Sequence, residues 1–237
     1  LFSKRTLPNG YGIGIDERIV EYPWIFSNLN IKDNTKILDA GSTFNFSFII
    51  NKIYKNAQLY IYTYYPEHNN YASKRISYIY GDLRDVPFKD NYFDTIICQS
   101  TIEHINMDNS IYGYTNSNNN DNTKPDYEYL KVIDELLRIL SYKGLLLLTF
   151  PYGKFENHGF FQQFNQQMVS LLIDKLTKKG IFEIVFFKYT KNGWQFSTEE
   201  ECKEAFSYNP HTGIGKDDDG AAHSRAICCI KFTKNLY

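Results

Sequence analysis

The sequence predicts an α/β protein with a doubly wound, mostly parallel sheet of seven strands and helices on both faces. Short apolar runs alternate with helical patterns along the chain, which is the order that builds a parallel sheet. The run at residues 95–99 is apolar enough for a strand buried on both faces. The first strand, residues 37–40, contains Asp39 near its end and turns at Gly41, a pattern typical of domains that bind a ligand at the carboxyl ends of strands.

The strands are expected as short segments rich in aliphatic and aromatic side chains. After residues 37–40 they cover residues 58–63, 77–80, 95–99, 145–150, 181–187 and 225–232. Helices are expected at residues 16–29, 46–54, 126–142, 166–178 and 198–205. In the clearest helix, apolar side chains from Leu130 to Leu140 recur at helical spacing, and Gly144 is the expected stop. Pro23 is expected to interrupt the first helix, because it lacks an amide hydrogen.

The chain is expected to form a single domain over residues 1–237, with residues 1–30 as an N-terminal helical extension. Residues 106–126 are polar and low in complexity, which predicts a mobile loop or a lid. The sequence begins at Leu1 rather than methionine, so some native N-terminal sequence is expected to be missing.

Composition narrows the class of partner and compartment. The formal net charge is -1 and the chain has no Lys/Arg cluster, so no nucleic-acid partner is expected. Its four cysteines form no metal-ligand spacing, and three lie in apolar runs, which favours reduced thiols and a cytoplasmic location. No apolar run has the length of a membrane helix, so no membrane insertion is expected. The acidic run Asp217–Asp219 is expected to be solvated, so no metal is predicted.

Five motifs follow one another between residues 36 and 153. They are Ile-Leu-Asp-Ala-Gly at 37–41, Gly-Asp at 81–82, the run at 86–98 with Pro-Phe-Lys-Asp-Asn-Tyr-Phe-Asp, the Glu-His pair at 103–104, and the helix-to-strand passage at 137–147. Their order and spacing resemble the class I S-adenosylmethionine-dependent methyltransferases, in the branch that includes the ubiquinone/menaquinone-type enzymes. The resemblance implies a Rossmann-like fold whose last strand runs antiparallel.

The resemblance also implies a site for S-adenosylmethionine outside the carboxyl ends of the strands. In the family, the residue at Asp39 anchors the amino-acid end of the cofactor, the residue at Asp82 accepts a hydrogen bond from the adenine amine, and Ser100 would lie near the methyl group. The full set of implied cofactor residues is Asp39, Gly41, Ser42, Thr63, Asp82, Leu83, Ser100 and Thr101.

Two positions depart from the family pattern. The cofactor loop has Gly41 but then continues Ser-Thr-Phe-Asn, where relatives have further glycines. Thr63 stands where relatives have the acid that binds the ribose hydroxyls. Glu67 is an alternative ribose ligand, although a surface carboxylate is an equal interpretation. These departures leave a catalytically silent relative as an alternative function.

Segments outside the five motifs resemble bacterial methyltransferases of cell-surface polysaccharide assembly. These segments are Tyr22-Pro23-Trp24 and residues 150–153, 156–164, 193–194 and 197–202. They imply O-methylation of a sugar hydroxyl on a glycan or nucleotide-sugar acceptor. Residues expected to line the acceptor site by stacking and hydrogen bonding are Tyr152, Asn157, Gln162, Gln163 and Trp194.

Transfer of a methyl group to a hydroxyl requires alignment of the reactants and removal of the hydroxyl proton. Histidine is the best-matched base near neutral pH, and His104 and His158 are the two catalytic candidates. A nicotinamide-dependent sugar oxidoreductase is a further alternative, but it requires a Gly-x-Gly-x-x-Gly loop that this sequence lacks. The sequence leaves the acceptor and the oligomeric state open.

Overall fold

An eight-stranded sheet with the order β3-β2-β1-β4-β5-β10-β8-β9 forms the centre of the protein. The computed structural model describes residues 2, 5–53, 55–74, 76–110, 123–219 and 223–236. The strands are β1 (Thr35–Ala40), β2 (Ala57–Thr63), β3 (Ser77–Tyr80), β4 (Phe93–Gln99), β5 (Leu140–Pro151), β8 (Gly180–Thr190), β9 (Gly193–Ser197) and β10 (Ala226–Lys234). A separate two-stranded sheet pairs β6 (Glu156–Asn157) with β7 (Gln162–Gln163).

The strands from β3 to β5 pair in parallel, which brings their carboxyl ends to one edge of the sheet. The last strand, β10, lies antiparallel between β5 and β8, as the family resemblance implied. The prediction of seven strands was one short. Residues 193–197 return from β8 in a tight hairpin and pair with it antiparallel as an edge strand. A run of five residues directly after a longer strand gave too weak a pattern to predict.

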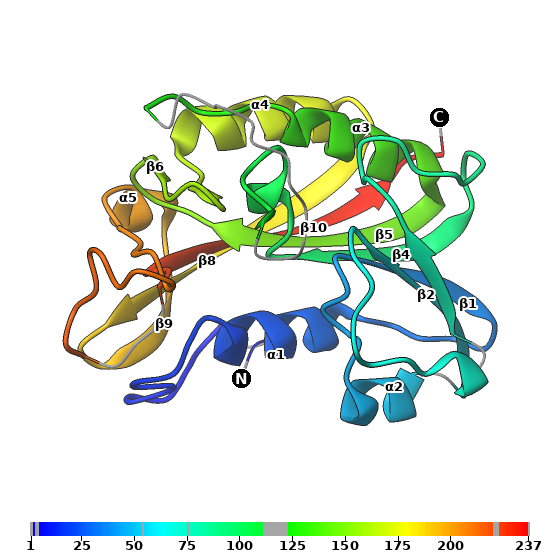
Figure 1. The fold of residues 1–237 in the computed structure, drawn as a ribbon, viewed down its shortest axis with the longest axis horizontal. Coiled ribbons are helices and arrows are strands. Elements are labelled where there is room, and N and C mark those ends of the chain that lie inside the picture. The colour runs from blue at the N-terminus through cyan, green and yellow to red at the C-terminus, as the bar shows by residue number, and fades with distance from the viewer. Residues whose placement is uncertain are drawn as a thin grey trace.

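Helices cover both faces of the sheet, as predicted. They are α1 (Arg18–Asn28), α2 (Ser47–Ile53), α3 (Tyr129–Ile139), α4 (Gln166–Thr177) and the short α5 (Glu199–Cys202). Figure 1 shows α3 and α4 together on one side of the sheet, and α1 and α2 on the opposite side. No helix in the described residues combines the length and the apolar character that crossing a membrane requires.

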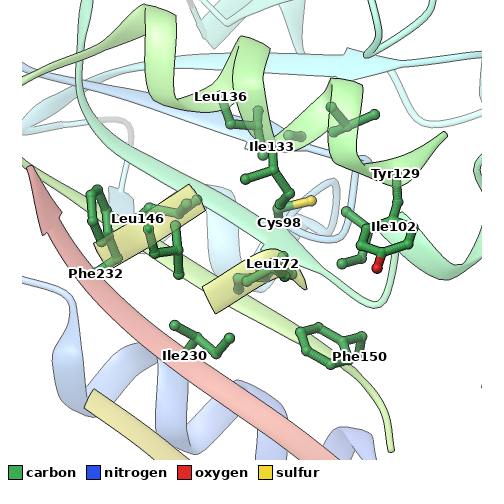
Figure 2. Packing of buried hydrophobic residues seen from close by; sticks show 14 of the residues in the cluster. Cys98, Ile102, Tyr129, Ile133, Leu136, Leu146, Phe150, Leu172, Ile230 and Phe232 are labelled. Atoms are coloured by element: carbon green, nitrogen blue, oxygen red, sulfur yellow. The ribbon is translucent and has the colours of Figure 1, made fainter. Parts of the chain in front are cut away.

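Each face of the sheet has its own buried layer. Figure 2 shows the layer under α3, where Ile133 and Leu136 meet Cys98 of β4 and Leu146 of β5. On the other face, Trp24 of α1 belongs to a second layer, which also includes the alternate residues of β1 and β4. A strand whose two faces are both covered must be apolar throughout, which explains the composition of β4.

Helix α1 continues through Pro23, so the predicted interruption was wrong. Proline cannot donate the hydrogen bond that the carbonyl oxygen of Ile19 would accept in a regular helix. The hydroxyl of Tyr11 donates to that oxygen instead, over 2.9 Å. A side chain from the preceding loop therefore satisfies the carbonyl that proline leaves free.

Helix α3 is shorter than the predicted span of residues 126–142 at both ends. Asp126 lies before the helix, and its carboxylate accepts the backbone N–H of Glu128 over 2.7 Å. Leu140 already has extended backbone and begins β5. The predicted mobile loop or lid at residues 106–126 lies in large part outside the described residues, which omit 111–122.

Candidate active site

A cavity of about 770 Å³ opens at the carboxyl ends of the parallel strands. Its walls come from loops that follow β1, β2, β3 and β4, at residues 41 and 43, 63–68, 81–84, and 100–101, 104–107 and 109, together with Arg18 of α1; Ser42 is not among the described lining residues. Small-molecule and cofactor sites typically enclose about 300–1,000 Å³. The cavity therefore has the size and the position expected for a cofactor of an open α/β sheet.

Asp39 fixes the loop after β1 by accepting hydrogen bonds from it. Its side chain is fully buried. One carboxylate oxygen accepts the backbone N–H and the hydroxyl of Thr43, each at 3.1 Å, and the other accepts the backbone N–H of Phe44 at 2.7 Å. Burial raises the pKa of Asp39 to about 7, against the lowering effect of these donors. Asp39 does not belong to the cavity wall among the described residues, so its geometry supports action through the loop rather than direct contact.

The same loop keeps a left-handed backbone with a single glycine. Gly41 has φ +124°, and a Cβ atom at this position would overlap the side chain of Thr101. Ser42 also has positive φ, +61°, and its buried hydroxyl has no hydrogen-bond partner among the described residues. A serine at such an angle carries backbone strain that a glycine would avoid. The loop therefore reaches its shape at a conformational cost.

The cavity end next to β3 carries Asp82 and Leu83, the two residues expected around the adenine. Asp82 lies in the wall, and its carboxylate pairs with the guanidinium of Arg84 through contacts of 2.7 and 3.0 Å. Partial burial would raise the pKa of Asp82, but the hydrogen bonds from Arg84 outweigh it and lower that pKa. Leu83 is buried beside this pair. The sequence did not indicate that Arg84 would occupy the expected adenine acceptor.

The loop after β2 brings both candidate ribose ligands to the cavity wall. Thr63 lines the cavity at the end of β2, and Glu67 lines it four residues later. The amide of Asn45 donates to the carboxylate of Glu67 over 2.8 Å, and Tyr78 donates its hydroxyl to the other end of the Asn45 amide over 2.9 Å. Glu67 is therefore an exposed carboxylate in the cavity wall that the Asn45 amide orients.

Ser100, Thr101 and His104 meet where the chain leaves β4. The short 3₁₀ helix η3 (Ile102–His104) carries His104 into the cavity wall. The Nδ1 atom of His104 lies 2.7 Å from the carbonyl oxygen of Phe160. A carbonyl oxygen only accepts, so Nδ1 carries the ring proton and Nε2 keeps a lone pair in the neutral ring. Burial lowers the pKa of His104 to about 4.

His158 approaches the same Phe161 ring as His104 but from outside the described cavity wall. Its Nε2 atom is 2.9 Å from the hydroxyl of Ser207, and its ring stacks on Phe161 with centroids 4.8 Å apart. Burial lowers its pKa as well. His158 is absent from the cavity wall within the described part of the chain, so the structure places only His104 beside Ser100 and Thr101.

The five residues expected around an acceptor are also absent from the described cavity wall. Their polar groups bind neighbouring loops and strands instead. The contacts are Tyr152 to Glu199 (3.1 Å), Asn157 to the amide of Gly159 (2.8 Å), Gln162 to Asp126 (2.9 Å), Gln163 to the carbonyl of Ala205 (2.9 Å) and Trp194 to the carbonyl of Ile15 (3.0 Å). This geometry supports a packing role for them.

Sequence reasoning missed a buried carboxylate that ties α1 to the site. Glu21 is fully buried and accepts the hydroxyl of Ser100 at 2.6 Å and that of Thr149 at 2.5 Å. Its other oxygen pairs with Arg18 at 2.5 Å. The spacing of Arg18 and Glu21 predicts only an ordinary helix-surface pair. No sequence signal showed that this face of α1 crosses the ends of β4 and β5.

Comparison of the sequence with known proteins finds one family match and one distant relative. Residues 50–148 match the family described as a methyltransferase domain. An uncharacterized protein of Methanocaldococcus jannaschii is 26% identical over 118 residues, which are 50% of this chain and 41% of that protein. The matched part thus spans less than half of that relative's length.

Two solved structures share the fold over most of the chain. The YcgJ protein of Bacillus subtilis has a TM-score of 0.54 at 11% identity, covering 92% of this chain and 99% of that one. A protein of Methanosarcina mazei, described as an S-adenosylmethionine-dependent methyltransferase, has a TM-score of 0.52 at 15% identity, covering 91% and 99%. Identities this low establish the fold alone. Residues 50–148 thus match a methyltransferase domain, and the chain shares its fold with a protein described as an S-adenosylmethionine-dependent methyltransferase.

Proposed function

We propose that this protein is an O-methyltransferase that acts on a sugar hydroxyl of a glycan or nucleotide-sugar precursor in the cytoplasm. Its cavity fits the cofactor in two respects. The volume is about 770 Å³, and Gly41 leaves open the space that a Cβ atom would fill against Thr101. We further propose that it belongs with the ubiquinone/menaquinone-type branch, because of the motif at residues 86–98. The segments at residues 22–24, 150–153, 156–164, 193–194 and 197–202 support a place among polysaccharide methyltransferases.

The observation that carries the proposal is the state of His104. The carbonyl of Phe160 holds its Nδ1 proton, so the free Nε2 lone pair belongs to a ring in the cavity wall. Burial lowers the pKa of His104 to about 4, so the ring is neutral at physiological pH and its Nε2 lone pair is available, while the lowered pKa makes it a weaker base than an ordinary histidine. An acceptor that must lose a proton, such as a hydroxyl group, suits this arrangement.

Bound S-adenosylmethionine supplies a methyl group that its sulfonium activates. On transfer of this methyl group to an acceptor hydroxyl, Nε2 of His104 would take the hydroxyl proton. The contribution of the protein is alignment and proton removal. We propose that Thr63 and Glu67 bind the ribose, that Asp82 and Leu83 bind the adenine, and that Asp39 acts through the loop of Gly41 and Ser42.

A catalytically silent relative is the second candidate. One observation favours it: Arg84 already occupies the Asp82 carboxylate that relatives offer to the cofactor. The strained backbone of Ser42 in the cofactor loop also favours a catalytically silent relative. The nicotinamide-dependent alternative has no comparable support, since residues 41–46 contain one glycine.

Two measurements separate these functions. Titration calorimetry with S-adenosylmethionine should show a single site, and transfer of a labelled methyl group should follow with cytosolic nucleotide-sugar extracts. Absence of binding at millimolar cofactor would contradict both candidates. Binding without transfer to any sugar acceptor would favour the silent relative.

A further inference from the structure

We propose that Arg18 of α1 binds the carboxylate at the amino-acid end of the cofactor. The inference rests on the proposed cofactor site and assigns a residue to the end of the cavity opposite Asp82. Neither the motifs nor the family match includes this residue, since the match begins at residue 50.

Two arginines line the described cavity wall, and they differ in what their guanidinium groups already bind. Arg84 donates from Nε and Nη2 to Asp82 and from Nη1 to Glu128 and Asn106. Arg18 donates from Nη1 to Glu21, while its Nε and Nη2 make no hydrogen bond to the described residues. A guanidinium carries five N–H donors in a fork that matches a carboxylate. Arg18 therefore has free donors in the cavity wall, and Arg84 has few.

Arg18 is also fixed at the correct end. Its partner Glu21 accepts the hydroxyl of Ser100, which lies where the chain leaves β4. Ser100 and Gly41 flank the expected position of the sulfur, whereas Asp82 and Leu83 mark the adenine end. The amino-acid part of the cofactor extends from the sulfur away from the adenosine. Its carboxylate is the anionic group that a guanidinium beside Ser100 would recognise.

The charges around Arg18 specify a zwitterion rather than a simple anion. The Arg18–Glu21 pair is neutral as a unit, so an added carboxylate alone would leave a net negative charge. Two further buried carboxyl groups, Glu17 and Glu103, have raised pKa values because of burial, and Glu17 reaches about 8. Near neutral pH Glu17 is protonated and does not compete for the guanidinium. The ammonium group of the ligand balances its own carboxylate.

The experiment compares two ligands by calorimetry on two proteins. S-adenosylhomocysteine carries the carboxylate, and its decarboxylated form, 5′-deoxy-5′-(3-aminopropylthio)adenosine, keeps the adenosine, sulfur and amine. The wild type should prefer the first ligand by about 10- to 100-fold, the effect of one charge-assisted hydrogen-bonded pair. Arg18→Gln should lose this preference while binding the decarboxylated ligand as the wild type does. Arg84→Gln is the matched control and should change the affinity for both ligands by the same factor.

An Arg18→Gln protein that keeps the full preference would overturn the inference, and so would one that loses affinity for both ligands equally. If this variant does not fold because Glu21 is left unpaired, Arg18→Lys decides the question. It should weaken binding of the carboxylate ligand alone by about 3- to 10-fold, because lysine keeps the charge without the fork. A wild type that binds neither ligand would instead overturn the proposed function, and this inference with it.

Discussion

Two regions meet at His104, the cavity and a cluster of aromatic loops outside the described cavity wall, and these two halves are built in different ways. The cofactor half uses loops that directly follow β1 to β4, so neighbouring strands bring its residues together. The half beyond His104 gathers residues from distant segments around two phenylalanines. His104 and His211 approach Phe160, with centroids 5.7 and 4.6 Å away, and His158 and His223 approach Phe161 at 4.8 and 5.9 Å.

This difference shows why one half is easier to infer from sequence. Residues at the ends of parallel strands share one edge by geometry, so a strand pattern already implies their neighbourhood. Histidines from residues 104, 158, 211 and 223 meet only because loops fold over one another. The order of these four histidines in the sequence does not predict that they lie close together. The predictions below test whether the two halves also separate in function.

The largest expected effect concerns the two histidines. His104→Ala should lower kcat by about 100- to 10,000-fold, the contribution of a general base, and leave cofactor affinity within about twofold. His158→Ala is the matched control in the same aromatic cluster and should keep most of the activity. Steady-state kinetics and calorimetry on both variants check this. Equal losses in the two variants would show that the cluster, rather than His104, supports turnover.

The next prediction compares one substitution in each half by its effect on unfolding free energy and on cofactor affinity. Asp39→Ala leaves the amides of Thr43 and Phe44 without their buried acceptor and should cost about 3 kcal/mol of unfolding free energy. Cofactor affinity should fall with it. Gln162→Ala, which frees Asp126 in the other half, should cost about 1–2 kcal/mol and leave cofactor affinity unchanged. Urea unfolding and calorimetry measure both quantities, and a cofactor defect in Gln162→Ala would contradict the separation.

A pH effect on stability is expected from Glu17, the buried residue directly before α1. Burial raises the pKa of Glu17 to about 8 from an ordinary 4.5, so the folded protein keeps a proton that the unfolded chain releases. The stability from Glu17 is thus fully present below about pH 4.5 and is lost as the pH rises through 8. Glu17→Gln cannot ionise. Between pH 6 and 8 it should gain about 2 kcal/mol relative to the wild type in urea unfolding, and parallel pH curves for the two proteins would contradict this.

The smallest effect concerns the strained residue of the cofactor loop. Ser42→Gly should raise the unfolding free energy by about 0.5 kcal/mol, because glycine adopts positive φ without strain and removes an unpaired buried hydroxyl. Thermal unfolding checks the direction. Ser47→Gly in α2 is the opposite control and should destabilise the protein. A lower unfolding free energy in both variants would show that Ser42 stabilises the fold through an interaction that its contacts do not reveal.

The fold was predictable where hydrophobic periodicity and the residues that end helices and strands determine the structure. The strands β1 to β5 appear in the predicted order, with ends mostly within a few residues. The failures came from contacts across the sequence. Pro23 fits inside α1 because Tyr11 satisfies the carbonyl of Ile19, and a pattern confined to the helix cannot show that contact.

The sequence brought several expected residues to one cavity, but it did not predict which charged groups pair there. The motifs placed Asp82, Thr63 and His104 at one cavity, but they could not show that Arg84 pairs with Asp82 or that Arg18 and Glu21 reach Ser100. The expected acceptor residues illustrate the same limit. Polar and aromatic side chains in irregular loops often satisfy buried backbone groups, as Gln162 and Trp194 do here, and sequence alone does not distinguish that task from ligand binding.

The hydrogen bond between His104 and Phe160 has a consequence for redesign. The partner of the ring is a main-chain oxygen, so the side chain at position 160 can be exchanged without removing it. An engineer who reshapes the surrounding loop for a new acceptor must instead preserve the path of the backbone. Insertions or deletions between residues 157 and 161 would release the imidazole to adopt its other tautomer, whereas substitutions there would leave the choice of tautomer intact.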